Sequence, residues 1–110
     1  MTLEQFLQQI GNDDTLDFED TIQVIADNYS YTPSAFQNGD LHNEAGQNEG
    51  SCKIFAFAKL HALDQETTLK CFGRFYQDVL NTPEGSDHGN IRNFMRHGWD
   101  GIEFSAPALA

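Results

Sequence analysis

The order of apolar and polar residues along the chain predicts a mostly helical protein built around one buried helix. Residues 54–58 follow one another without a polar break, and a helix that is apolar on every side is one that other elements surround. We expect this central helix to run from Cys52 to Ala62, with Ser51 as its N-cap. The polar stretch 43–51, which contains two glycines, should form an irregular loop at the N-terminus of the helix.

Amphipathic helices are predicted on both sides of the central one, because apolar residues recur there at helical spacing. Their expected bounds are 3–10, 17–28, 64–80 and, after a cap at Ser86 or Asp87, a last stretch that Gly98 ends. Thr2 and Gln5 fit a capping box at the start of the first helix. Together with the central helix, these segments give about five helices.

A small antiparallel sheet is predicted from a hairpin signal and a short alternating segment. Asn38 and Gly39 stand between two short apolar segments, and a type I′ turn, which needs positive φ at both central residues, favours this pair. The expected strands are 34–37 and 40–43. The alternation over 102–104 could add a third strand, and the residues after it should be frayed.

Length and hydropathy indicate one α+β domain that spans residues 1–110. A chain of 110 residues is close to the common size of a single domain. Its mean hydropathy is negative, and no apolar run approaches the length of a membrane span. The first ten residues lack the basic region and apolar core of a secretory signal. We therefore expect no membrane association and a cytoplasmic location.

The charge of the chain is distributed unevenly, and this bears on its partners. Residues 1–52 carry ten of the seventeen acidic residues and none of the six basic ones. Nucleic acid and anionic lipid are therefore poor partners, because phosphate binding needs clustered Lys and Arg. The acidic half either steers the protein toward a basic partner surface or serves as a solvated face that keeps it in solution. The two cysteines, expected in different helices, should be free thiols in a reducing compartment.

Four blocks of the sequence resemble the HopJ type III effector family over roughly residues 2–104. They read YTPSAFQNG, NEAGQNEGSCKIFAFAKLHAL, TLKCFGRFY and DHGNIRNFMRHGWDGIEF. The family takes its name from a plant-pathogen protein that is delivered by type III secretion, and similar small proteins occur in many Gram-negative bacteria. The resemblance implies possible delivery to a host cell. It implies no catalytic residues, because the family has no assigned active site.

Cys52 is the first candidate for chemistry. As the first residue of its helix it would lie among unpaired N–H groups, which lower the pKa of a thiol. Lys53 adds positive charge, and His88 with Asp87 could complete a Cys–His–Asp set in a hydrolase or transferase. The alternative is a small buried residue without a chemical role, which is the usual place of a free cysteine.

A metal site is the second candidate, and the sequence does not support it. His42, Glu44, Asp87 and His88 are suitable ligand types. However, no HExxH or CxxC motif is present, and the 38–51 loop lacks the residue spacing of an EF-hand. We predict neither a metal nor another cofactor.

Anion recognition at the start of the central helix is the third candidate, because the N–H groups at a helix N-terminus donate hydrogen bonds to an anion. Alternatively, Glu44 or Glu49 folds back and caps the helix itself. The leading hypothesis is a non-catalytic interaction or binding module, whose ligand is a protein surface or a small molecule. The predicted binding residues are Asn43, Glu44, Gln47, Asn48, Glu49, Ser51, Lys53 and Arg92, bordered by Asp87 and His88.

Overall fold

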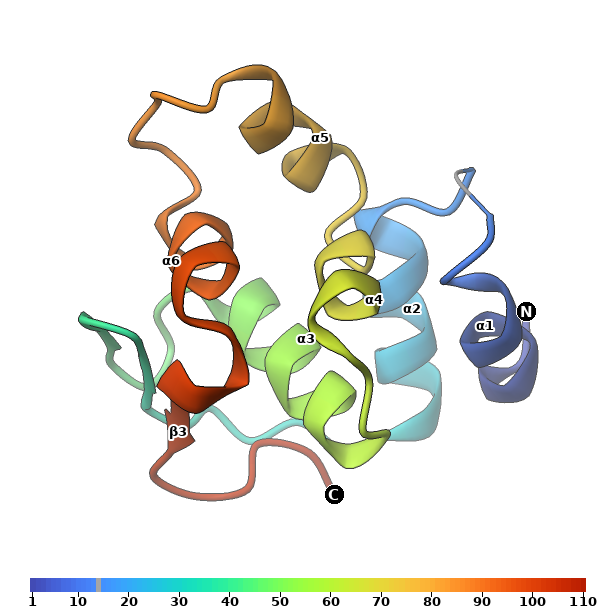
Figure 1. The fold of residues 1–110 in the computed structure, drawn as a ribbon. Helices are drawn as coiled ribbons and strands as arrows, with labels where there is room; N and C mark the ends of the chain where they lie inside the picture. Colours follow the sequence, from blue (N-terminus) through green and yellow to red (C-terminus); the bar gives the residue numbers. More distant parts are fainter. Residues whose placement is uncertain (14) are drawn as a thin grey trace.

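The apolar run in the middle of the chain forms helix α3, Glu49–Leu60, around which the other elements pack (Figure 1). The computed structural model of the protein describes residues 1–13 and 15–110. Ile54, Phe55, Phe57 and Ala58 each have a relative exposure of 0%, as expected for a helix that is apolar on every side. The prediction of a surrounded central helix is confirmed.

The two ends of α3 differ from the prediction. The helix begins at Glu49, and its N-cap is Asn48 rather than Ser51. Ser51 lies within the first turn, so Cys52 is not the first helical residue. At the other end, the Leu63 N–H donates to the Ala58 carbonyl over 2.9 Å. This is the 6→1 hydrogen bond of a Schellman motif, which ends the helix.

Two helices on the N-terminal side follow the prediction closely. Helix α1, Leu3–Gln9, starts with the expected capping box between Thr2 and Gln5. Helix α2, Phe18–Asn28, starts at Asp17, whose carboxylate caps it. No helix in the described part of the chain is both long and apolar enough to cross a membrane.

The predicted helix over 64–80 is divided into two. Helix α4, Gln65–Lys70, is separated from α5, Arg74–Asn81, by a turn in which Gly73 has a φ of 57°. A Cβ atom on Gly73 would lie 2.2 Å from Oδ1 of Asp17. The glycine therefore lets the start of α2 approach the chain closely, and the helix breaks there.

The last helix, α6 (Gly89–His97), ends at Gly98 as predicted and begins after His88 rather than after Ser86 or Asp87. The short 3₁₀ helix η1, Gly98–Gly101, leads from it into the sheet. Because the 64–80 segment is divided, the described residues form six α-helices instead of about five.

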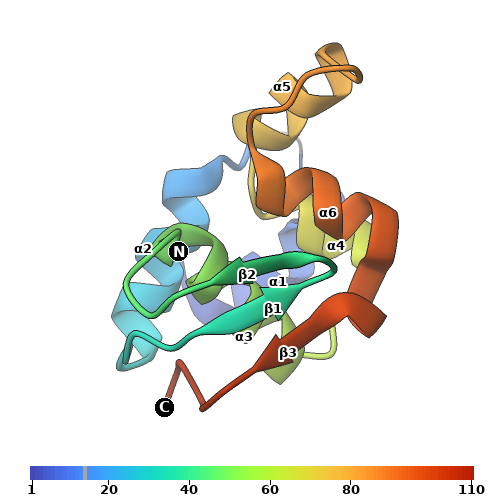
Figure 2. The same cartoon turned by 90° about the vertical axis from the view of Figure 1, so that its left-hand side faces the viewer.

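The three strands form the predicted antiparallel sheet, in the order β2-β1-β3 (Figure 2). Strand β3, Ile102–Phe104, confirms the predicted third strand. Strands β1 (Phe36–Asn38) and β2 (Leu41–Asn43) are joined through Gly39 and Asp40. Gly39 has a positive φ, but Asn38 and Asp40 do not, so the turn lacks the two positive φ values of type I′. The predicted type I′ turn centred on Asn38 and Gly39 is therefore wrong. Asn38 instead ends β1, with a relative exposure of 0%.

The residues after β3 are ordered, which corrects the expectation of a frayed end. The N–H of Ser30 donates to the carbonyl of Ala110 over 2.8 Å, and the N–H of Ala110 donates back to Ser30 over 3.0 Å. The side chains of Ala108 and Leu109 are only 2% and 5% exposed. Ala108 and Leu109 therefore belong to the core.

Candidate functional site

The two polar segments that the sequence singled out meet in space. Residues from the start of α3 and from the start of α6 line one cleft of about 390 Å³. We call it the α3–α6 cleft. Asn48, Gly50 and Ser51 form one side of it, and residues 88–91 form another. The remaining wall is apolar and consists of Phe18, Leu41, Phe72 and Phe75.

Both helices begin at the cleft with the same uncommon geometry. The N-caps Asn48 and His88 are left-handed, with φ values of 49° and 52°, and neither side chain caps its own helix. The N–H groups of a first helical turn have no partner within the helix. The expected cap by Glu44 or Glu49 is wrong, because among the described residues no first-turn N–H of α3 donates to either carboxylate. The Glu44 carboxylate instead lies 3.1 Å from Nε2 of His42. The helix ends therefore present N–H donors at the cleft.

A buried group of asparagines holds these two helix ends together. Oδ1 of Asn90 accepts hydrogen bonds from Nδ2 of Asn38 over 3.0 Å and from Nδ2 of Asn43 over 3.1 Å. In return, Oδ1 of Asn43 accepts from Asn90 over 3.0 Å and from Asn48 over 2.7 Å. Asn43 has a relative exposure of 0% and positions the two helix ends, and a ligand contact at this residue stays a prediction.

Asn38 and Asn90 were absent from the predicted site. The only signal for them in the sequence was that several asparagines lie close to glycines at the ends of the helices and strands. Pairing between residues so distant along the chain depends on the tertiary fold, and no local pattern indicates it.

His88 lies at the edge of the cleft, between an aromatic ring and two carboxylates. Its ring centroid is 5.4 Å from that of Phe75. Its Nε2 atom is 3.8 Å from a carboxylate oxygen of Asp78 and 3.7 Å from one of Asp87. Both distances exceed the length of a hydrogen bond. Asp87 therefore does not orient His88 as the predicted Cys–His–Asp set requires.

Arg92 stabilises the loop that precedes His88. Its guanidinium donates to Oδ1 of Asp87 over 2.7 Å, to the carbonyl of Asp87 over 2.6 Å and to the carbonyl of Thr82 over 2.8 Å. The Arg92 side chain is only 13% exposed, and its hydrogen bond holds the pKa of the Asp87 carboxyl below the usual value. The structure thus places Arg92 in a clamp across the α5–α6 connection.

Cys52 does not have the environment of an activated thiol. It is the fourth residue of α3, and its N–H already donates to the Asn48 carbonyl over 3.0 Å. The residue is 1% exposed, its thiol faces the Ser34 carbonyl at 3.6 Å, and it is absent from the cleft lining. Burial raises the pKa of the Cys52 thiol. The first-turn position and the lowered pKa on which the nucleophile hypothesis depended are therefore both wrong.

Most of the other predicted residues lie on the surface beside the cleft. Glu44, Gln47 and Glu49 are exposed. Lys53 is absent from the cleft lining, and its Nζ lies 4.7 Å from the ring centroid of Tyr31, on the side of α3 near the end of the chain. Cys52 and Cys71 are free, as expected. Among residues 1–13 and 15–110, no three His, Cys, Asp or Glu side chains gather closely enough to hold a metal ion.

The comparisons with known proteins place the chain in a family. Its fold is similar to a crystal structure of "unknown function protein VPA0580", with 56% sequence identity and a TM-score of 0.97. The similarity covers 100% of this chain and 93% of the other. No curated protein matches the chain. The family model of the HopJ type III effector protein matches residues 3–109. With a match over nearly its whole length, the chain belongs to the HopJ type III effector family.

Proposed function

We propose that the protein is a non-catalytic binding module and that the α3–α6 cleft is its binding site. The observation that carries the proposal is the meeting of two helix N-termini, distant along the chain, in one cleft. Their N–H groups are donors for carbonyl or carboxylate oxygens of a ligand. Because the asparagine group fixes both helix ends, the donors are arranged before a ligand arrives, which lowers the entropic cost of binding.

The ligand that fits these walls best is a basic segment of a partner protein. Carboxylates stand beside the N–H donors: Glu49 is exposed at the start of α3, and the Asp78 side chain is 59% exposed next to His88. A peptide supplies backbone carbonyls for the helix ends, Lys or Arg for the carboxylates, and an apolar side chain for the wall around Phe75. The overall charge of −11 steers basic partners toward the protein.

The test is a titration of the ¹⁵N-labelled protein with a short Lys- and Leu-containing peptide, compared with a peptide in which Glu replaces Lys. We expect the basic peptide to shift the amide signals of Ser51, Gly89 and Asn90. Asp78→Asn and Glu49→Gln should each weaken binding by roughly two- to fivefold, as exposed ion pairs do. Glu66→Gln removes a carboxylate exposed on α4 and is the matched control, with an unchanged affinity expected.

Two results would contradict this proposal. If the acidic peptide binds equally well, charge complementarity at the cleft is wrong. If free arginine shifts the same signals with the same affinity as the peptide, the ligand is a small molecule and not a protein segment.

We further propose that the protein is made in the bacterial cytoplasm and that the type III system delivers it to a host cell, where a role in virulence would follow. Two buried free thiols suit a reducing compartment, and the family is described as a type III effector protein. A fusion to a calmodulin-dependent adenylate cyclase tests delivery. Host-cell cyclic AMP should rise only with a functional secretion system, and an equal rise without it would contradict the proposal.

A further inference from the structure

We propose that a second surface, the groove between α3 and the segment after β3, is a docking site for an acidic peptide segment of a partner protein. We call it the α3–tail groove. It is distinct from the α3–α6 cleft and has a volume of about 590 Å³. Its main lining residues are Ala56, Lys59, Leu60, Phe104, Ala108 and Leu109.

The floor of the groove is apolar and held in place. Ala108 and Leu109 are almost completely buried, and the backbone pairing of residues 108–110 with residues 30–32 fixes them. At the rim, Leu60 is 58% exposed. A large apolar side chain of a partner would contact this floor and remove Leu60 from water, and the burial of Leu60 favours binding.

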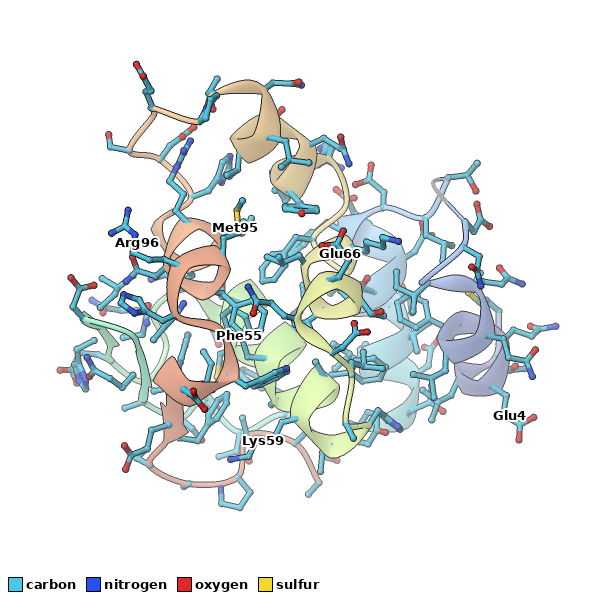
Figure 3. The ribbon with its side chains drawn as sticks, viewed as in Figure 1. Glu4, Phe55, Lys59, Glu66, Met95 and Arg96 are labelled. Atoms are coloured by element: carbon cyan, nitrogen blue, oxygen red, sulfur yellow. The ribbon has the colours of Figure 1, made fainter. Side chains whose placement is uncertain are left out.

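One lysine lines this groove in an otherwise acidic protein, and a second lies near it on α3. Lys59 lines the groove, with its Nζ 6.0 Å from the ring centroid of Phe104. Lys53 lies on the same outer stripe of α3, since residues 53, 56 and 60 are neighbours at helical spacing. Figure 3 shows Lys59 near the C-terminal end of α3, beside the segment after β3.

These lysines differ from Arg74 and Arg92 in having no acidic partner. Arg74 pairs with Asp17 and Glu19, and Arg92 pairs with Asp87. Within the described residues, neither Lys53 nor Lys59 forms a salt bridge. Unpaired lysines next to an apolar floor are complementary to a segment that combines carboxylates with apolar side chains.

The backbone of β3 favours a peptide over a lipid chain as the occupant. Strand β3 is at the edge of the sheet. Between β1 and β3, the Gly39 N–H donates to the Gly101 carbonyl (2.9 Å), and the Ser105 N–H donates to the Ala35 carbonyl (3.0 Å). Along β3, residues whose backbone groups point toward β1 therefore alternate with residues whose groups point away from it. In that alternation the N–H and C=O of Phe104 point away from β1. An extended peptide could pair with them, as in strand addition.

The experiment uses the full chain and a panel of fluorescein-labelled heptapeptides with Leu or Phe at alternate positions. The intervening positions are Glu, Ser or Lys in three otherwise equal series. We expect the Glu series to bind best and to shift the amide signals of Lys59, Leu60 and Ala108. Lys59→Glu should weaken the Glu series by roughly threefold or more and improve the Lys series. Leu60→Asp should weaken binding by about tenfold, because it removes apolar contact and adds repulsion.

The matched control is Arg96→Glu, which makes the same change in net charge at an exposed position of α6 that does not line the groove. The affinity of this variant for the Glu series should stay within roughly twofold of the affinity of the unaltered protein, because salt screens the effect of a charge that is far from the groove. Equal losses in Lys59→Glu and Arg96→Glu, or no signal shift with any peptide at millimolar concentration, would overturn the proposal. So would shifts with laurate alone, which would identify a fatty-acid site. None of these results depends on the α3–α6 cleft.

Discussion

Ala62 holds a φ of 52° directly after α3, at the position where helices prefer glycine. A Cβ in the left-handed region costs about 1–2 kcal/mol, and Ala62 is exposed, so no packing is lost with the methyl group. Ala62→Gly should raise the free energy of unfolding by about 0.5–1 kcal/mol. This gain is smaller than the relieved strain, because glycine also increases the entropy of the unfolded chain. Urea denaturation measures the change.

The control for this prediction is the same substitution at Ala26, an exposed residue in the interior of α2. There, glycine should lower the free energy of unfolding by about 1 kcal/mol. A loss of stability in both variants would show that the strain at Ala62 is negligible.

The cysteines give a second prediction at the scale of single residues. Burial raises the pKa of the Cys52 thiol and raises that of Cys71 to about 12. We expect both to react with iodoacetamide at pH 7.5 much more slowly in the native protein than in urea, with mass spectrometry to follow each site. Rapid alkylation of Cys52 alone in the native protein would revive the nucleophile hypothesis.

His61 should make stability depend on pH. Burial lowers the pKa of its imidazole, and its Nε2 atom forms a hydrogen bond with the Tyr29 hydroxyl. The folded state therefore binds protons less well than the unfolded state, so the contribution of the neutral ring is complete above the unfolded pKa of about 6.5 and is lost on acidification. In His61→Gln, the decrease in the free energy of unfolding from pH 7.5 to 5.5 should be smaller than in the unaltered protein. Equal decreases would contradict the assignment.

At the scale of elements, the asparagine group joins the sheet to the N-termini of α3 and α6. Asn90→Ala removes the side-chain acceptor for Asn38 and Asn43. Nδ2 of Asn43 then loses its partner, whereas Nδ2 of Asn38 keeps its bond to the Asn90 carbonyl. We expect a loss of about 2–4 kcal/mol in the free energy of unfolding, together with larger chemical-shift changes at Ser51 than at Ala26. Asn81→Ala, at an exposed position in α5, is the control and should have little effect. A similar loss in both variants would show that the buried bonds are not the cause.

The elements that sequence patterns predicted are those with local causes. The capping box at Thr2, the end of α6 at Gly98 and the apolar core of α3 depend on nearby residues. The break at Gly73 depends on the approach of Asp17, and the hairpin turn moved by one residue because Asn38 bonds to Asn90. For the same reason, the sequence indicated the two polar segments of the site but not the bonds that join them.

At the scale of the whole molecule, the charge of −11 opposes folding through self-repulsion. We expect the urea midpoint to rise when NaCl increases from 10 to 300 mM, because salt screens repulsion between exposed carboxylates. Parallel titrations with NaCl and KCl separate screening from specific ion binding, since the two salts should act alike. A midpoint that falls with salt would show that attractive ion pairs, such as that of Arg74 with Glu19, dominate instead.

The pairing of residues 30–32 with residues 108–110 also sets the order of events during translation. Tyr31 leaves the ribosome early, yet its backbone partner Leu109 is synthesised 78 residues later. Until then, a nascent chain lacks the side chains that cover this side of the central helix, and contacts of such sequence separation form slowly. The chain therefore reaches its final core only after residue 110 has emerged, and during that interval an incomplete chain is open to chaperones, proteases and aggregation.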